Sequence, residues 1–310
     1  MSIVAIMVHV LVQWRFRWVP LPANIPSLEK LAIDPAWTVA DWRLAVQIFI
    51  DEFSPDETWL PELRAAESNL EQQWAEHIYR HLLESRRAGA QMITINQTEY
   101  PPLLSLIADP PFALSVLGKV ENLRHAIVAV VGARKASAYA MQHTFDLGQR
   151  LAKEGYAVAS GGAFGCDIAA HRGVLAAART LGYAPAIAVF AGGMHELQPS
   201  GNQQIFQKLL AEGATCVSER LWWHESKPFD YPIRNRLVAG MASATFMMQA
   251  AERSGAMITA RLALDQGRDL YVLPHEPDDV RAAGNARLQF EGAPTIDEFF
   301  PLCEDETPVP

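Results

Sequence analysis

The sequence predicts an α/β protein, with an extended Rossmann-like parallel sheet, helices on both faces, and a small, mainly helical module in front of it. From residue 126 onward, short apolar runs alternate with amphipathic helical patterns, which is typical of a parallel sheet covered on both faces. Between residues 27 and 87 the apolar residues recur with helical spacing instead. Ligands of such sheets bind at the carboxyl ends of the strands, so the turns that follow the apolar runs are the candidate functional positions.

Four segments are expected along the chain. They are a helical N-terminal module at 1–95, a linker at 96–125, the Rossmann-like domain at 126–296 and an acidic tail at 297–310. The apolar run Ile3–Val12 is shorter than the roughly 20 residues that span a bilayer. Its arginines follow the run rather than precede it, so we interpret it as a packed strand or helix and not as a signal peptide. Gln91–Ile95 is a short strand candidate, and the prolines that follow it mark turns.

The elements of the Rossmann-like domain are short and regularly spaced, and right-handed connections are expected between them. The predicted strands are 127–131, 157–159, 186–190, 215–217, 245–248 and 270–273. The predicted helices are 138–153, 166–180, 202–212, 233–241 and 257–267.

The composition is that of an ordinary soluble protein, with 310 residues, half of them hydrophobic, and a formal net charge of −9. Residues 126–295 are nearly balanced, with 16 Lys and Arg against 15 Asp and Glu. An acidic total argues against a general nucleic-acid-binding surface but is compatible with a local basic patch. Cys166, Cys216 and Cys303 lack metal-ligand spacing, so we expect small buried residues, a reducing cytoplasmic compartment and no metal.

The first candidate turn follows the strand at 127–131. Gly132 ends the strand, Arg134 and Lys135 project from the turn, and Ser137 is placed to cap the next helix. The pattern is not GxGxxG, and no acidic residue stands at the spacing of a ribose contact, so a dinucleotide site is weakly supported. Two cations beside backbone donors suit phosphate instead. A solvated basic turn is the alternative.

The second turn, Ser160–Gly162, leads into the helix that carries Asp167 and His171. Glycines at a strand-to-helix turn let backbone N–H groups approach an anion. Asp167 and His171 lie four residues apart, on one face of the helix. The pair is open to three interpretations: an acid/base device, a local hydrogen bond, or helix packing.

The third turn brings Arg234, Asn235 and Arg236 to the start of a helix. Two arginines at a helix start oppose the macrodipole, so we expect them to bind phosphate or to pair with carboxylates such as Glu219. The fourth turn, Ser254-Gly255, either exposes backbone N–H groups or is an ordinary N-cap. Several anion-binding turns on one sheet edge describe a groove, which suits a phosphodiester backbone or, if the turns converge, one nucleotide.

Taken in order, these motifs resemble the DprA/Smf family of DNA-processing proteins. The matching segments are VGARKAS (131–137), SGGAFGCDIAAH (160–171), AVFAGGM (188–194), SE (218–219), YPIRNR (231–236), RSGAMITA (253–260) and GNARLQFEGA (284–293). Seven segments in family order, over residues 97–295, make the resemblance specific. It implies single-stranded-DNA binding, dimerisation and delivery of that DNA to the RecA recombinase, with no enzymatic activity, cofactor or membrane association.

The resemblance and the turns together assign the expected site. The residues expected to bind DNA or phosphate are Arg134, Lys135, Ser137, Ser160, Gly161, Gly162, Arg234, Asn235, Arg236, Ser254 and Gly255. The residues expected to shape the groove are Gly132, Gly165, Asp167 and His171. The chain departs from the family pattern at Ala191, His195, Gln198, Gln249 and His275. No winged helix of the kind that ends many members is expected.

The leading functional hypothesis is a single-stranded-DNA-binding recombination mediator, a homodimer that loads RecA in transformation, recombination or DNA defence. The alternative is a Rossmann-like sensor of a small nucleotide, which the acidic composition favours. A nucleotide-base hydrolase of the cytokinin-activating type is disfavoured, because its PGGxGTxxE signature is missing.

Overall fold

The computed structural model describes residues 84–95, 97–111 and 113–300. The helical module predicted at 1–95 lies outside the described residues except for its last segment, and Cys303 also lies outside them. Among the described residues, no helix is both long enough and apolar enough to cross a membrane.

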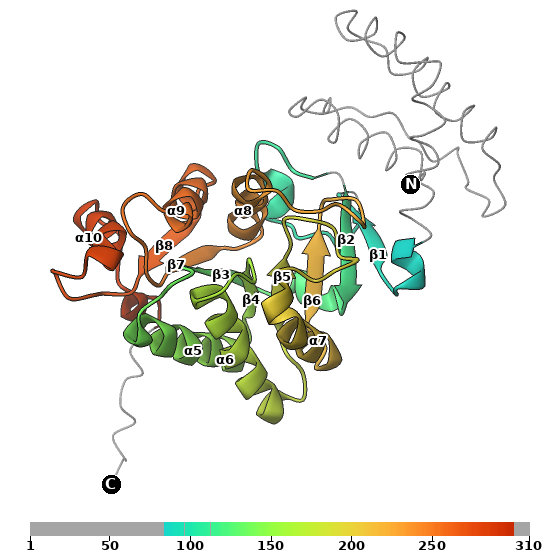
Figure 1. Ribbon diagram of the computed structural model, residues 1–310, viewed down its shortest axis with the longest axis horizontal. Coiled ribbons are helices and arrows are strands. Elements are labelled where there is room, and N and C mark those ends of the chain that lie inside the picture. Colours follow the sequence, from blue (N-terminus) through green and yellow to red (C-terminus); the bar gives the residue numbers. More distant parts are fainter. Residues whose placement is uncertain (1–83, 96, 112, 301–310) are drawn as a thin grey trace, which may run out of the picture.

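One eight-stranded sheet forms the centre of the described part of the chain (Figure 1). Its strands, in spatial order, are β1 (Gln91–Thr94), β2 (Ala113–Gly118), β6 (Thr215–Ser218), β5 (Ala186–Val189), β4 (Ala157–Ser160), β3 (Ile127–Val131), β7 (Ala244–Met247) and β8 (Asp269–Val272). Strands β3 to β8 are parallel, whereas β1 and β2 are joined to the β6 edge by antiparallel pairing.

Helices cover both faces of the sheet (Figure 1). On one face lie α5 (Ala138–Lys153), α6 (Cys166–Leu181) and α7 (Gln203–Ala211), and on the other lie α8 (Asp230–Gly240), α9 (Gly255–Asp265) and α10 (Ala283–Phe290). The described residues also form short 3₁₀ helices: η2 (Leu104–Leu106), η3 (Val120–Arg124), η4 (Ser200–Asn202), η5 (Val280–Ala282) and η6 (Ile296–Phe299).

The two hydrophobic cores follow from the alternation of side chains along each strand. In β3, Val128 and Val130 belong to the core beneath α5 and α6, whereas Ile127, Ala129 and Val131 belong to the core beneath α8 and α9. Every residue of this strand is buried. A strand apolar on both faces is the pattern of a parallel sheet, and the Rossmann-like prediction is confirmed, with each predicted strand and helix shifted by at most a few residues.

The predicted linker at 96–125 is wrong, because this segment contributes β2 to the sheet. Strand β2 pairs with β6 through Ser115 and Ser218, and β1 then pairs with β2. Both proline pairs lie in the connection between β1 and β2, where the Tyr100 hydroxyl donates to the Pro111 carbonyl oxygen at 2.6 Å. The strand candidate at Gln91–Ile95 is confirmed as β1.

Helix η6 and its C-cap residue Phe300 occupy the first residues of the predicted acidic tail, 297–310. Helix η6 packs on the sheet, with Ile296 and Phe300 buried. The ring of Phe299 lies 4.9 Å from that of Phe246 in β7, in an edge-to-face arrangement. Phe300 therefore belongs to the core and Phe299 packs against it, whereas Asp297 and Glu298 are exposed.

Candidate nucleic-acid interface

A small pocket of about 90 Å³ lies at the carboxyl ends of β3, β4 and β5. Its lining includes Arg134, Gly161, Phe164, Gly193, Tyr231 and Arg234. Three of the four predicted turns therefore contribute side chains or backbone to one pocket. They come from the β3–α5 loop, the β4–α6 loop and the beginning of helix α8. The fourth turn, Ser254-Gly255, does not line this pocket.

Arg234 supplies a buried positive charge to the pocket. Its side chain is only 5% exposed, and its Nη1 donates to the carbonyl oxygens of Gly161, at 2.8 Å, and of Val189. Its Nε donates to the Asn235 side-chain oxygen at 3.2 Å. Burial lowers the pKa of the guanidinium, while nearby Asp167 opposes the shift. An arginine remains charged at neutral pH, so the pocket has a fixed cation in its wall.

Helix α8 begins earlier than the sequence predicts, and this changes the position of the arginines. The helix starts at Asp230, so Arg234 stands one turn inside it and not at its N-terminus. The conflict with the macrodipole that the sequence suggested is therefore weaker, since the effect is concentrated in the first turn.

Gly161 allows the guanidinium of Arg234 to approach the β4–α6 turn. A Cβ atom on Gly161 would lie 2.3–2.8 Å from the Nη and Cζ atoms of Arg234. Gly162 is backed by the ring of Phe206, which a Cβ would meet at 2.7 Å. Only glycine at these positions leaves the turn this close to its neighbours.

Gly132 and Gly165 hold the first two turns against each other. Gly165 has a φ of 81°, in the region that favours glycine, and a Cβ there would lie 2.1 Å from the Ala133 carbonyl oxygen. At Gly132 a Cβ would lie 2.5 Å from the Cys166 sulfur. Cys166 and Cys216 are buried and form no disulfide bond, as the sequence predicts for them.

Asp167 and His171 are both buried but do not form an acid/base pair. Asp167 accepts a hydrogen bond from the Ala163 backbone N–H at 3.2 Å, which closes the glycine turn. Burial raises the pKa of its carboxyl group, and the charge of Arg234 opposes that shift. Neither ring nitrogen of His171 has a hydrogen-bond partner within the described residues, and burial lowers the pKa of His171 to about 4. His171 is therefore a neutral core side chain.

Two of the three predicted serines use their hydroxyl groups inside the fold. Ser160 is fully buried and donates to the Val130 carbonyl oxygen at 2.7 Å. Ser137 caps α5 by accepting from the Ala140 backbone N–H at 3.1 Å. Within the described residues, the serine hydroxyls thus stabilise the turns, and the exposed polar side chains of these loops are those of Arg134 and Lys135.

Arg236 points away from the pocket. It is 7% exposed and forms ion pairs with Glu219 and, through Nε at 2.9 Å, with Asp109. Pairing with Glu219 is the alternative that the sequence left open. Arg234 and Arg236 are two residues apart on a helix and so face different directions, which explains why only one of them reaches the pocket.

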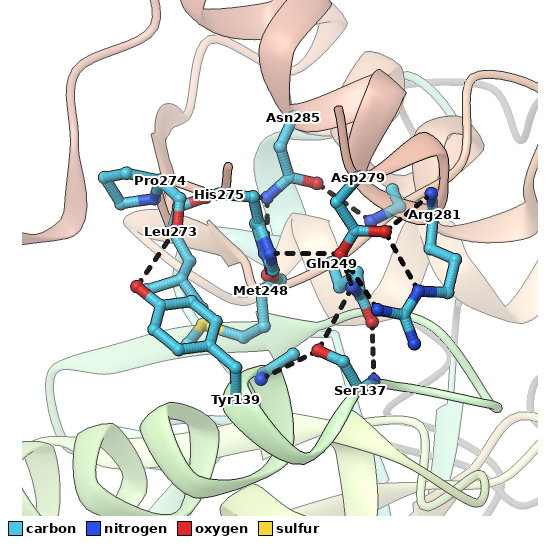
Figure 2. Close-up of polar contacts among 12 residues, drawn as sticks. Ser137, Tyr139, Met248, Gln249, Leu273, Pro274, His275, Asp279, Arg281 and Asn285 are labelled. Atoms are coloured by element: carbon cyan, nitrogen blue, oxygen red, sulfur yellow. Dashed lines mark hydrogen bonds and ion pairs between the residues drawn. The ribbon is translucent and has the colours of Figure 1, made fainter. Parts of the chain in front are cut away.

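The topological switch point lies between β3 and β7, where the chain changes direction along the sheet. Ligands commonly bind in the crevice at such a point, but in this protein side chains fill it (Figure 2). Gln249 is fully buried; its Oε1 accepts from the Ser137 backbone N–H at 2.8 Å, and its Nε2 donates to Asp279 at 3.0 Å. His275 hydrogen-bonds the Met248 carbonyl oxygen at 2.7 Å. The open pocket therefore lies one strand further along, beside β4.

The fourth predicted turn lies beyond this filled crevice. Ser254 is the N-cap residue of α9, but its buried hydroxyl has no hydrogen-bond partner within the described residues. Gly255 is exposed and begins the helix.

Sequence reasoning missed the aromatic side chains of the pocket. Phe190 is buried in the core, whereas Phe164 and Tyr231 are not buried. The guanidinium of Arg134 lies 5.0 Å from the centre of the Tyr231 ring, a cation–π arrangement that orients the arginine. Both aromatics stand inside the quoted motifs, next to the residues assigned to the site. For Phe164 the available signal was an aromatic residue within a glycine turn.

Asp230 holds the loop that carries one wall of the pocket. Its carboxylate is almost fully buried and pairs with Arg220 at 2.8 Å. It also accepts from the Lys227 backbone N–H at 2.8 Å and lies 3.0 Å from His224 Nε2. These contacts fix the segment before α8 and so position Tyr231, the next residue.

Comparison with known proteins identifies the family. The model of the DNA recombination-mediator protein A family matches residues 91–306. Protein Smf of Escherichia coli is 31% identical over 91% of this chain and 73% of its own length, and DNA processing protein DprA of Bacillus subtilis is 31% identical over 75% of this chain and 76% of its own length. Protein Smf of Synechocystis is 33% identical over 70% of this chain, which spans only 54% of that relative.

Two solved structures resemble the fold. DNA processing protein A of Helicobacter pylori, whose structure is described for its single-stranded-DNA binding mode, has a TM-score of 0.59 and 29% identity, covering 66% of this chain and 90% of its own. DprA of Streptococcus pneumoniae has a TM-score of 0.62 and 26% identity, covering 82% of this chain and 89% of its own. With its family motifs gathered at one edge of a Rossmann-like sheet, the chain belongs to the DNA recombination-mediator protein A family.

Proposed function

We propose that the protein binds single-stranded DNA along the carboxyl ends of β3, β4 and β5. The observation that carries the proposal is the convergence of exposed Arg134, the Gly161 turn and buried Arg234 on one pocket. Exposed cations and backbone donors beside a fixed positive charge suit the phosphates of a nucleic-acid strand. The Helicobacter pylori relative, described as binding single-stranded DNA, supports the choice of ligand.

The proposed roles differ between residues. Arg134 and Lys135 contact phosphates directly, because both are exposed in the β3–α5 loop. Gly161 and Gly162 offer backbone groups to the phosphates, and Arg234 adds a buried positive charge behind the turn. The proposed path continues past the filled crevice to Ser254 and Gly255 at the start of α9.

Other side chains have supporting roles. Asn235 holds Arg234 in place, because its side-chain oxygen accepts a hydrogen bond from Arg234 Nε. Arg236 stabilises the junction between α8, Glu219 and Asp109. The hydroxyl groups of Ser137 and Ser160 stabilise the turns in which these serines lie.

The binding test is a titration of fluorescein-labelled oligonucleotides, followed by anisotropy, across a salt series. Affinity should fall steeply with salt, since phosphate contacts release counterions, and should depend little on sequence. Absence of binding at low salt would overturn the proposal.

We infer further that a homodimer delivers the bound strand to RecA, as the family resemblance implies. The test is RecA ATPase activity on single-stranded DNA already coated with single-strand-binding protein, with and without this protein. Stimulation is the expected result. DNA binding without stimulation would remove the mediator role and leave DNA binding intact. Sedimentation analysis would test the dimer.

The second candidate is a sensor of a small nucleotide, which the size of the pocket favours. About 90 Å³ accommodates a phosphate group more readily than a long strand. Thermal unfolding with a panel of nucleotides separates the two functions, because a ligand that binds the native state raises Tm. A nucleotide that raises Tm while oligonucleotides do nothing would replace the DNA-binding proposal.

A further inference from the structure

We propose that Phe164 is a nucleobase-stacking residue that makes the site selective for single-stranded over double-stranded DNA. The inference rests on the proposed function, since it needs a DNA strand at the pocket. It adds a stacking contact with a base, whereas Arg134, Lys135 and Arg234 interact with the phosphates of the DNA backbone.

The exposure of Phe164 is the first observation. Phenylalanine is usually buried, yet this side chain is 49% exposed and belongs to neither hydrophobic core. It also lines the pocket together with Arg134 and Arg234. An exposed aromatic ring beside two guanidinium groups is the combination that single-strand-binding proteins use, with cations for the backbone and a ring for the bases.

The second observation is that the loop beneath Phe164 is firmly held. Glycines with positive φ flank it, Gly162 at 67° and Gly165 at 81°. The backbone of Ala163 is tied on both sides, since its N–H donates to Asp167 at 3.2 Å and its carbonyl oxygen accepts from Ile168 at 3.2 Å. The loop therefore presents the ring at little additional entropic cost, which is the advantage of a preorganised contact.

One edge of the Phe164 ring lies next to Gly201, while about half of the residue is accessible to solvent. A Cβ atom on Gly201, in η4, would lie 2.9 Å from the Phe164 ring, so this glycine leaves room for the ring edge. Of the other two aromatic residues that line the pocket, Phe190 is only 3% exposed and belongs to the core, and Tyr231 already has the Arg134 guanidinium over its ring. Phe164 is thus the pocket aromatic with surface to offer to a base.

Selectivity follows from the geometry of nucleic acids. The bases of a duplex are stacked on one another and cannot place a face on a protein side chain without being unstacked, whereas those of a single strand can. A ring at the mouth of a phosphate pocket favours the single strand through this contact, independently of charge.

The experiment compares two oligonucleotides of equal length and charge, oligo(dT) and an abasic strand, in anisotropy titrations with the full chain. Phe164→Ala should weaken oligo(dT) binding by about 5- to 150-fold, the effect of losing one stacked base, and leave abasic binding unchanged. Phe164→Trp should retain oligo(dT) binding. Phe290→Ala removes another exposed aromatic, 93% exposed on α10 and absent from the pocket lining, and should bind both strands as the wild type does.

The outcomes separate the two proposals. Wild-type binding to oligo(dT) that Phe164→Ala leaves unchanged, or an equal loss on both strands, would overturn the stacking role alone. Failure of the wild type to bind either strand would overturn the proposed function, and this inference with it. Tm of each variant, expected within a few degrees of the wild type for these exposed positions, verifies that the fold is intact.

Discussion

The guanidinium of Arg234 donates a hydrogen bond to the carbonyl oxygen of Gly161 at 2.8 Å and so joins helix α8 to the turn that follows β4. The absence of a side chain on residue 161 makes this contact possible. Two motifs 73 residues apart in the chain become one structure through it. The relationship places a buried positive charge directly behind the glycine turn at which we propose that an anion binds.

Gly161→Ala tests this relationship. The added Cβ would lie 2.3 Å from Arg234 Nη2, so the buried guanidinium must move, which we expect to cost about 1–3 kcal/mol of folding free energy. Urea unfolding measures the loss, and oligonucleotide affinity should fall with it. Gly255→Ala is the matched control for stability, because a Cβ there meets nothing within 4 Å. Equal stabilities for the two variants would contradict the role of Gly161.

Arg134→Ala and Lys135→Ala should each weaken single-stranded-DNA binding and flatten its salt dependence. Removing one phosphate-binding cation should lower the slope of log K against log salt by about 0.7. Arg179→Ala is the control, since Arg179 is exposed near the far end of α6, away from the carboxyl edge of the sheet. If Arg179→Ala weakens binding as much as Arg134→Ala, the basic residues act only through overall charge.

Gln249→Glu should destabilise the protein at neutral pH. The amide accepts from Ser137 and donates to Asp279 at once, and a carboxylate cannot donate. The substitution would place two carboxylates about 3 Å apart, so we expect a loss of about 1–3 kcal/mol in unfolding free energy.

The pH dependence identifies the cause of that loss. Like-charge repulsion raises the folded-state pKa of the introduced carboxyl group. The difference from the wild type should therefore shrink as pH falls through that pKa, and grow as pH rises. Asp279→Asn in the same chain removes the second carboxylate and should restore stability. A deficit independent of both pH and Asp279 would contradict the account.

His171 should make the fold sensitive to acid. Its pKa is about 4 in the folded protein, against an ordinary value of 6.5. Protonation therefore favours the unfolded state: the contribution is complete above pH 6.5 and is lost as pH falls toward 4. The shift corresponds to about 3 kcal/mol.

The measurement is urea unfolding of the wild type and His171→Leu between pH 7.5 and 4. The stability of His171→Leu relative to the wild type should rise as pH falls, because leucine has no proton to bind. Two parallel pH profiles would show that His171 is not buried in a neutral form.

Periodicity and turn chemistry were sufficient for the central fold. The strand at Ile127–Val131 and the helix at Ala138–Lys153 lie where the apolar pattern predicts them. Strand β2, which lies inside the predicted linker, was missed. Strand β2 reads as part of a linker because its six residues acquire their role only by pairing with β6, almost a hundred residues later.

The sequence predicted which loops form the candidate site, but not how their side chains are arranged in space. Glycine turns and cations after strands indicated where a ligand would bind, since that depends on local backbone chemistry and sheet topology. The sequence could not distinguish Arg234 from Arg236, because both are arginines in one motif. Their surroundings decide: Arg234 meets carbonyl oxygens beside the pocket, and Arg236 meets two carboxylates.

The family and the alternation of strands and helices follow from the sequence alone, as do the loops proposed to bind an anion, because motifs, periodicity and glycine turns are local properties of the chain. Which side chains face the ligand depends instead on the tertiary structure. The crevice beside β3 is filled by Gln249, which follows β7, while Phe164 stays exposed beside β4. Burial and pairing depend on residues that are distant in sequence, so packing decides whether a polar or aromatic side chain stabilises the fold or remains free to bind.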